Sequence, residues 1–188
     1  MYLIDASSII YAWDNYPITL FPCLWEWGAE RIAAGDFTMA QCAYEECEKN
    51  RPGCHNWLKT NKIKRYDHRS LSIIKRSVAI RKLLKIDVNG YHADGVGEND
   101  IYIISTAKEY NCTLVSNENV QRSRLPTKES RYKIPAVCDR PEVAVTCISF
   151  LELLTTLMPN FASYMTEPIE EIDFELDEES SSEEEDDL

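Results

Sequence analysis

Acidic residues recur in this chain where an apolar segment ends or a helix begins. Asp5 directly follows the apolar run MYLI, with Ser7 two residues on, and Glu118 lies two residues after Ser116, the last residue of the strand-like run NCTLVS. Other acids stand early in helical segments: Asp100 in DIYIISTAKEY, and Glu45 and Glu46 in QCAYEECEKN. In open α/β sheets, ligands bind beyond the carboxyl ends of the strands. We therefore expect four carboxylates, distant in sequence, to meet at one edge of a sheet.

Such a meeting of carboxylates has an energetic cost that limits what can occupy the site. Two like charges about 4 Å apart repel by roughly 4 kcal/mol at an effective dielectric constant near 20. The cluster therefore persists only if it is protonated, paired with Lys or Arg, or bridged by divalent cations. Carboxylate oxygens prefer hard ions, which indicates Mg²⁺ or Mn²⁺.

The elements that would position these acids alternate along the chain. Strands are expected at 1–4, 36–40, 111–116 and 145–149, and helices at 7–13, 21–35, 41–50, 70–86, 100–110 and 150–158, with a short helix in the basic segment 50–62. This alternation predicts a three-layer α/β/α sandwich with a central, mainly parallel sheet, formed by residues 1–160.

Residues at the ends of these helices suggest where each helix begins or ends. We expect Ser7 or Ser8 to cap the first helix, Gly35 to end the second, and Asn99 to cap the helix at 100–110. Residues 122–137 contain no clear period and are expected to be irregular.

The net charge of −12 conceals three regions of different charge. Residues 1–48 hold eight acids and one base, residues 49–85 hold 12 bases and one acid, and residues 167–187 hold 13 acids and no base. The acidic, serine-rich segment 161–188 is expected to be a disordered tail, either solubilising or covering the basic surface. The basic segments are expected either to be solvated or to bind a nucleic acid backbone, and the candidates are Lys62, Lys64, Arg65, Arg69, Lys75, Arg76, Arg122 and Arg124.

The remaining composition favours a reduced chain without a membrane segment. The seven cysteines are scattered and include no C-x-x-C pair, so free thiols are expected. No apolar stretch approaches the roughly 20 residues of a membrane span, and the N-terminus lacks the basic start of a signal peptide. We expect a cytoplasmic protein whose three histidines lie at the surface.

Four segments of the chain contain the candidate acids: LIDASSII at the start, AYEEC in the middle, and ENDIYIISTA and LVSNEN later in the chain. Together they resemble the corresponding motifs of a known family, the PIN domains. The chain also resembles a little-studied PIN-like prokaryotic group that shows Phe-Pro before a Trp-rich helix and a late KIP-x-VC run, here FPCLWEW and KIPAVC. The chain departs from the common PIN pattern at two positions, with Glu118 in place of Asp and Ser116 in place of Thr.

The resemblance implies a metal-dependent endoribonuclease, with some relatives acting as toxins of toxin–antitoxin pairs. Asp5, Glu46, Asp100 and Glu118 would hold Mg²⁺ or Mn²⁺, and Ser7 and Ser116 would orient water or phosphate. Hydrolysis of RNA, or of single-stranded DNA, would leave a 5′ phosphate and a 3′ hydroxyl. An antitoxin protein and a second copy of the chain are the partners that the resemblance suggests.

Plainer interpretations of each acid stay open at this point. Asp5 taken singly could cap a helix, Asp100 could favour its helix N-terminus, and Glu118 could be an ordinary loop acid. Glu45 competes with Glu46, and Asp94 competes with Asp100. Cys47, Cys54 and His55 could hold structural zinc, although the spacing matches no common site.

Two other functions compete with that of a nuclease. The chain could be a catalytically weak PIN-like scaffold that binds RNA or a protein, which the departure at Glu118 favours. It could also be a small-molecule phosphatase, but Asp5-Ala6-Ser7 lacks the second acid of the D-x-D nucleophile pattern.

Overall fold

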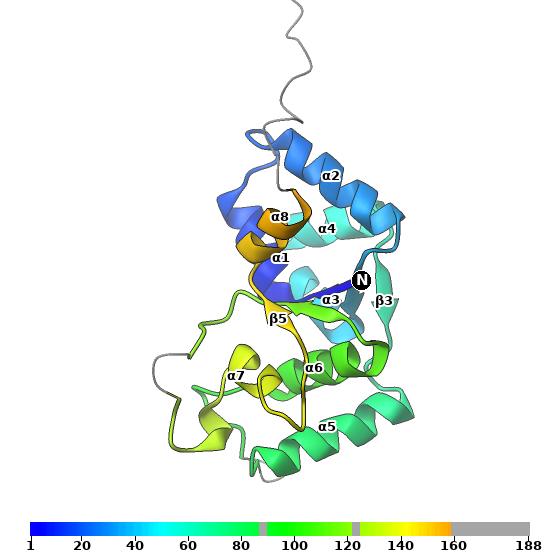
Figure 1. Cartoon of the computed structure of the whole chain (residues 1–188). Coiled ribbons are helices and arrows are strands. Elements are labelled where there is room, and N and C mark those ends of the chain that lie inside the picture. The colour runs from blue at the N-terminus through cyan, green and yellow to red at the C-terminus, as the bar shows by residue number, and fades with distance from the viewer. Residues whose placement is uncertain (87–89, 122–124, 159–188) are drawn as a thin grey trace, which may run out of the picture.

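The computed structural model describes residues 1–86, 90–121 and 125–158, which form a three-layer α/β/α domain (Figure 1). The expected tail at 161–188 and two candidate basic residues, Arg122 and Arg124, lie outside the described residues. The predicted fold class is confirmed: the central sheet is parallel throughout the described part of the chain, and helices flank both of its faces.

The sheet has the strand order β3-β2-β1-β4-β5. Its strands are short and largely buried where they lie centrally, as expected for a parallel sheet covered on both faces. They are β1 (Tyr2–Ile4), β2 (Phe37–Ala40), β3 (Lys64–Tyr66), β4 (Thr113–Val115) and β5 (Cys147–Ile148). Because β1 lies between β2 and β4, the residues that follow these three strands are neighbours at the carboxyl edge of the sheet.

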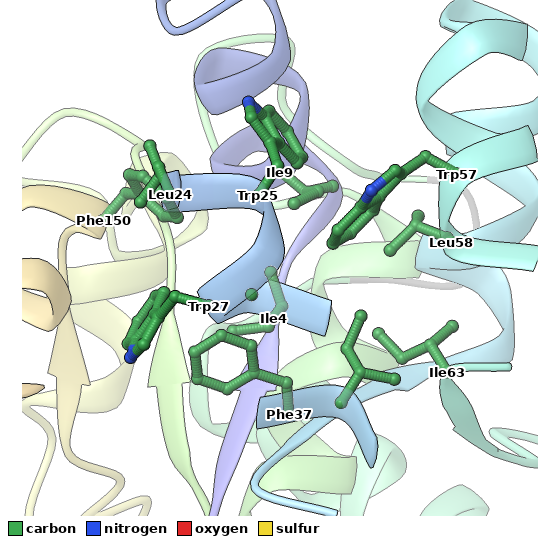
Figure 2. A pocket seen from close by; sticks show the side chains of 12 residues that line it. Ile4, Ile9, Leu24, Trp25, Trp27, Phe37, Trp57, Leu58, Ile63 and Phe150 are labelled. Atoms are coloured by element: carbon green, nitrogen blue, oxygen red, sulfur yellow. The ribbon is translucent and has the colours of Figure 1, made fainter. Parts of the chain in front are cut away.

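One face of the sheet is covered by helices from the beginning and the end of the domain (Figure 1). They are α1 (Ala6–Asn15), α2 (Pro22–Ala33), α4 (Pro52–Thr60) and α8 (Phe150–Leu157). Trp25 and Trp27 of α2 are buried here and, with Trp57 of α4, line a small apolar cavity above the sheet (Figure 2). Gly35 follows α2 with a φ of 79°, in the left-handed region, and ends this helix as predicted.

The other face carries α5 (Leu71–Leu83), α6 (Glu98–Tyr110) and α7 (Ile134–Cys138), with α5 packed against α6. Ile73 and Ile80 of α5 are buried, and Ile103 and Ile104 of α6 are fully buried. Helix α3 (Gln41–Asn50) follows β2 and contacts α1, α4 and α6, so it lies where the two layers meet at the edge of the sheet.

Several local predictions were wrong. Helix α1 begins at Ala6 with Asp5 at its N-cap position, so neither Ser7 nor Ser8 caps it. Helix α6 begins at Glu98 after Gly97, so Asn99 lies inside the helix.

Two elements were missed by the sequence analysis. Strand β3 is rich in basic residues, which are depleted in central strands but tolerated at an edge. The short helix α7, and the turn of 3₁₀-helix before it (Glu129–Arg131), lie in a segment that was expected to be irregular.

All seven cysteines carry free thiols, as predicted. Two of the three histidines are buried, His55 and His68, contrary to the expectation that all three lie at the surface. Among the residues that the structure describes, no helix combines the length and the apolar character needed to cross a membrane.

Candidate metal and nucleic-acid site

Each of the four predicted acids either follows a strand of the sheet or lies on helix α3 or α6. We call Asp5, Glu46, Asp100 and Glu118 the carboxylate rim. Asp5 follows β1, Glu118 lies three residues after the end of β4, Glu46 lies on α3, and Asp100 lies in the first turn of α6. Asp5 is buried and the other three side chains are partly exposed.

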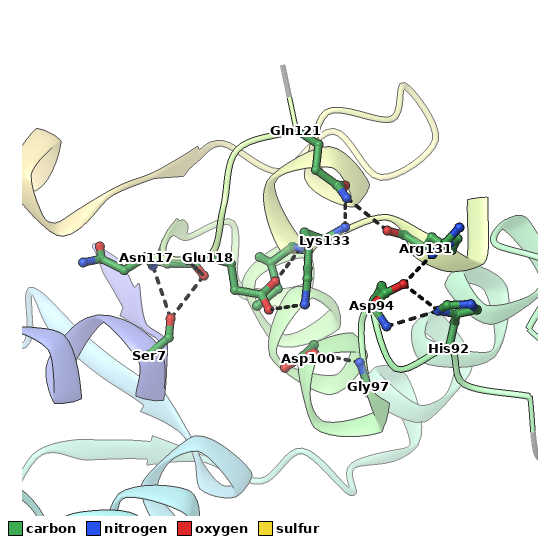
Figure 3. A network of polar contacts seen from close by, with 12 residues as sticks. Ser7, His92, Asp94, Gly97, Asp100, Asn117, Glu118, Gln121, Arg131 and Lys133 are labelled. Carbon is green, nitrogen blue, oxygen red and sulfur yellow. Dashed lines mark hydrogen bonds and ion pairs between the residues drawn. The ribbon is translucent and has the colours of Figure 1, made fainter. Parts of the chain in front are cut away.

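Asp5 is held by hydroxyl groups rather than by the helix that it precedes. Its carboxylate makes no capping hydrogen bond to α1. Instead, Oδ2 of Asp5 accepts hydrogen bonds from Oγ of Ser7 and, at 3.1 Å, from Oγ of Ser116. Ser7 in turn accepts a hydrogen bond of 3.2 Å from the backbone N–H of Asn117 (Figure 3). Asp5 therefore occupies the N-cap position, but its side chain does not cap the helix, so capping does not explain a buried carboxylate.

The environment of Asp5 disfavours its charge. Burial, with the nearby charges of Asp100 and Glu46, raises the pKa of the Asp5 carboxyl from 3.8 to about 7, against the opposing effect of the two serine hydroxyls. This value places the proton exchange of a buried acid near neutral pH, which is uncommon outside functional sites.

The other rim acids show the same influence. Burial, then the charges of Asp100 and Glu118, raises the pKa of Glu46. Burial also raises the pKa of Asp100, where the Glu118 charge adds to the effect and a hydrogen bond from the Gly97 N–H opposes it. The charges of the four acids thus influence one another.

The two alternative candidates, Glu45 and Asp94, have other partners. Glu45 is exposed and accepts a hydrogen bond from Gln41, and Asp94 is exposed and pairs with Arg131.

Two of the rim carboxylates are also bound by protein groups. Oδ2 of Asp100 accepts a hydrogen bond of 2.7 Å from the Gly97 N–H, as the N3 residue of a capping box. Oε2 of Glu118 accepts a hydrogen bond of 2.8 Å from the Ile134 N–H, and Oε1 accepts one of 3.4 Å from Nζ of Lys133 (Figure 3). Within the described residues, no three His, Cys, Asp or Glu side chains stand together in a geometry that could hold a metal ion, and this includes Cys47, Cys54 and His55.

The sequence analysis missed the residues that organise this edge. The side chain of Asn117 accepts a hydrogen bond of 2.8 Å from the N–H of Phe150, which ties the edge to α8. Gln121 donates to the carbonyl of Arg131 and accepts from the N–H of Lys133, so it clamps the segment that carries Lys133 (Figure 3). The run KIP could have indicated this helix start, because Pro is favoured in the first turn.

The predicted nucleic-acid residues lie along the edge strand and the helix that follows it. Lys62 precedes β3, Lys64 and Arg65 lie on it, and all three are exposed. The Arg65 guanidinium lies 4.6 Å from the centre of the ring of Tyr44, a residue of α3, which also carries Glu46. Arg69 and Lys75 are also exposed, whereas Arg76 is half-buried and pairs with Glu109 between α5 and α6. The ion pair of Arg76 with Glu109 therefore joins helices α5 and α6.

Comparisons with known proteins identify a family but no activity. The model of a family described as "Domain of unknown function (DUF4411)" matches residues 2–161. The comparison with curated proteins finds no match. Among solved structures, VapBC2 from Rickettsia felis, in a crystal structure bound to a DNA fragment from its promoter, is similar over 70% of this chain and 96% of that chain. The identity is 20% and the TM-score is 0.44.

Proposed function

We propose that this chain, which belongs to the family described as a domain of unknown function (DUF4411), is a metal-dependent nuclease of the PIN-like kind that hydrolyses RNA phosphodiesters. The single observation that carries the proposal is Asp5, a buried carboxyl with a pKa raised to about 7 at the carboxyl edge of a parallel sheet. A buried acid whose side chain neither caps a helix nor pairs with a base would lower stability without benefit, so we infer that it serves a ligand.

The chemistry of the rim suits a hard divalent cation. Its four side chains offer carboxylate oxygens alone, and burial, together with the charges of neighbouring rim acids, raises the pKa of three of them. Asp5, Glu46, Asp100 and Glu118 would hold Mg²⁺ or Mn²⁺. When bound, such an ion supplies a water of lowered pKa and neutralises charge on a phosphodiester under attack.

The residues around the rim would hold the substrate in place. The hydroxyl groups of Ser7 and Ser116, which lie 3.4 Å apart and both donate to Asp5, keep this carboxylate in one orientation. The exposed bases Lys64 and Arg65 on the edge strand β3, and Lys62 just before it, would contact the phosphate backbone. An antitoxin partner and pairing with a second copy stay predictions.

A cleavage assay tests this proposal directly. A mixed pool of RNA and single-stranded DNA would be incubated with Mn²⁺ and the full chain, its Asp5→Asn variant, or the control variant Glu45→Gln. We expect cleavage of RNA to be lost in Asp5→Asn and retained in Glu45→Gln. Equal cleavage by the wild type and Asp5→Asn, or no cleavage by either, would contradict the proposed activity.

A specific observation favours a second candidate, the PIN-like scaffold with a weak metal site. Lys133 already gives Glu118 a positive partner, and no three potential ligands within the described residues are arranged around one ion. Calorimetric titration with Mn²⁺ separates the two functions. If the chain is a scaffold, the heat of Mn²⁺ binding should not depend on Asp5, Glu46 and Asp100. If it is a nuclease, Mn²⁺ should bind to the wild type, and Asp5→Asn should abolish this binding.

A further inference from the structure

The ammonium group of Lys133 lies at the carboxylate rim, 3.4 Å from Oε1 of Glu118. Both side chains are partly buried, with exposed fractions of 28% for Lys133 and 21% for Glu118. Burial raises the pKa of Asp100, and the charge of Lys133 opposes this rise to a small degree. Lys133 therefore acts on two of the four rim acids, from an element that supplies none of them (Figure 3).

The backbone around Lys133 is fixed from both sides, so the point from which its side chain extends is fixed. Its N–H donates a hydrogen bond of 2.8 Å to Oε1 of Gln121, and the N–H of the next residue, Ile134, donates one to Glu118. The carbonyl of the preceding residue, Tyr132, accepts a hydrogen bond of 2.9 Å from the Val96 N–H. Only the side-chain ammonium of Lys133, on its flexible stem, is free to move without disturbing these bonds.

A positive charge at this place has opposite effects on the two charged ligands that the proposed nuclease would bind. It stabilises the rim without a metal ion, because it offsets like charges that otherwise repel. A divalent cation that binds Glu118 must displace this ammonium or accept its repulsion. A phosphodiester beside the rim would instead be attracted to it.

From this geometry we propose that Lys133 is an exchangeable counter-cation of the carboxylate rim: it neutralises Glu118 before a divalent cation binds, and it then turns to the substrate phosphate. The inference rests on the proposed function and assigns Lys133 a positioning role in it. It also explains how the rim carboxylates can lie near one another with Glu118 directed toward α7.

Calorimetric titration of the full chain with Mn²⁺ tests the exchange without measuring activity. Lys133→Met removes the competing charge and keeps an unbranched side chain that is one atom shorter. We expect Lys133→Met to bind Mn²⁺ about two- to fivefold more tightly than the wild type, the range for a partly exposed ion pair. Lys59→Met removes an equal charge from the exposed end of α4 and should leave the affinity unchanged.

The direction of the change separates this role from a purely structural one. If Lys133 only held Glu118 in place, Lys133→Met would bind Mn²⁺ more weakly or equally well, and either result overturns the inference. A wild-type chain that binds no Mn²⁺ overturns the proposed function and this inference with it. The two failures are therefore distinguishable.

Kinetics at saturating Mn²⁺ test the second half of the exchange. Lys133→Met should raise the KM for RNA severalfold with kcat changed less than twofold, and Lys133→Arg, which keeps the charge, should restore KM. An unchanged KM in Lys133→Met would overturn the contact with the substrate phosphate.

Discussion

Oγ of Ser116 donates a hydrogen bond of 3.1 Å to Oδ2 of Asp5, and this bond joins the residue after β4 to the residue after β1. The two strands are neighbours, with Ile4 in register with Val115, so the next residues of both strands meet at the edge of the sheet. The bond shows how adjacent parallel strands bring together side chains separated by more than a hundred residues. It also stabilises the charged form of a carboxyl that burial disfavours.

The raised pKa of Asp5 predicts that the metal-free protein loses stability as the pH rises. The folded state binds this proton more tightly than the unfolded state, so the stabilisation is full below pH 3.8 and is lost as the pH rises toward about 7. The loss amounts to at most about 4 kcal/mol for a shift of this size. In urea unfolding with EDTA, Asp5→Asn should be more stable than the wild type at pH 8 and equal to it near pH 4.

A matched control for this pH effect is Asp14. The Arg51 side chain lowers the pKa of the exposed Asp14 carboxyl, so Asp14→Asn should leave stability at pH 8 unchanged or slightly lower. Equal pH profiles for the wild type and Asp5→Asn would contradict a raised pKa at Asp5.

Mn²⁺ should stabilise the folded chain through the rim acids. Saturation at 100 times Kd stabilises the native state by about 2.7 kcal/mol, which raises Tm by roughly 5–10 °C for a domain of this size. Differential scanning fluorimetry at pH 8 should show this rise in the wild type and in Glu45→Gln. Glu46→Gln should lose most of it, because Glu46 shares the electrostatics of the rim and Glu45 does not. A larger loss in Glu45→Gln would assign the helix ligand to Glu45.

Removal of the Ser116 hydroxyl should raise the pKa of Asp5 further. Ser116→Ala removes one of two hydrogen bonds to the charged carboxylate, and such bonds are worth about 1.5–3 kcal/mol. Carboxyl chemical shifts of Asp5, followed by NMR as a function of pH, should show the higher midpoint. Ser116→Thr keeps a hydroxyl at the same position and should titrate like the wild type; a raised midpoint in both variants would indicate a packing effect instead.

Gly95 should tolerate no side chain. A Cβ there would lie 2.0 Å from the carbonyl oxygen of Ser130, so the backbone of the segment before Lys133 would have to shift. Gly95→Ala should destabilise the domain by about 1–3 kcal/mol and lower nuclease activity through the displaced segment. At Gly97 a Cβ would meet only the Asp100 carboxylate at 3.6 Å, so Gly97→Ala should cost less than about 1 kcal/mol. Equal urea midpoints for the two variants would contradict the close approach.

The sequence predicted four of the five strands, and it placed Asp5 and Glu118 after two of them, because both follow from local pattern. An apolar run that ends in an acid places that acid at the end of a strand. Because parallel strands have their carboxyl ends at the same edge of the sheet, the acids that follow them become neighbours. Asp5 illustrates this, since its position followed from MYLI alone. The burial of Asp5 and its serine partner from another strand depend on tertiary packing, which the sequence pattern does not reveal.

The missed features have a common physical cause. Lys133 reaches Glu118 only because Gln121 and Gly95 allow two loop segments to lie against each other, and loop contacts leave no periodic signal. Strand β3 is paired on one side only and contains two basic residues, so its composition resembles a loop. Asp100 has two roles at once. Its carboxylate accepts a hydrogen bond from the N-cap residue of α6, which agrees with the plainer interpretation of this acid, and it also belongs to the rim.

The distribution of the rim along the chain has a consequence for its synthesis. A ribosome adds about 5–20 residues per second, so Glu118, the last rim acid, follows Asp5 by roughly 6–23 s. Until then, the growing chain lacks part of the rim. The proposed metal site can therefore form only after most of the domain has been synthesised.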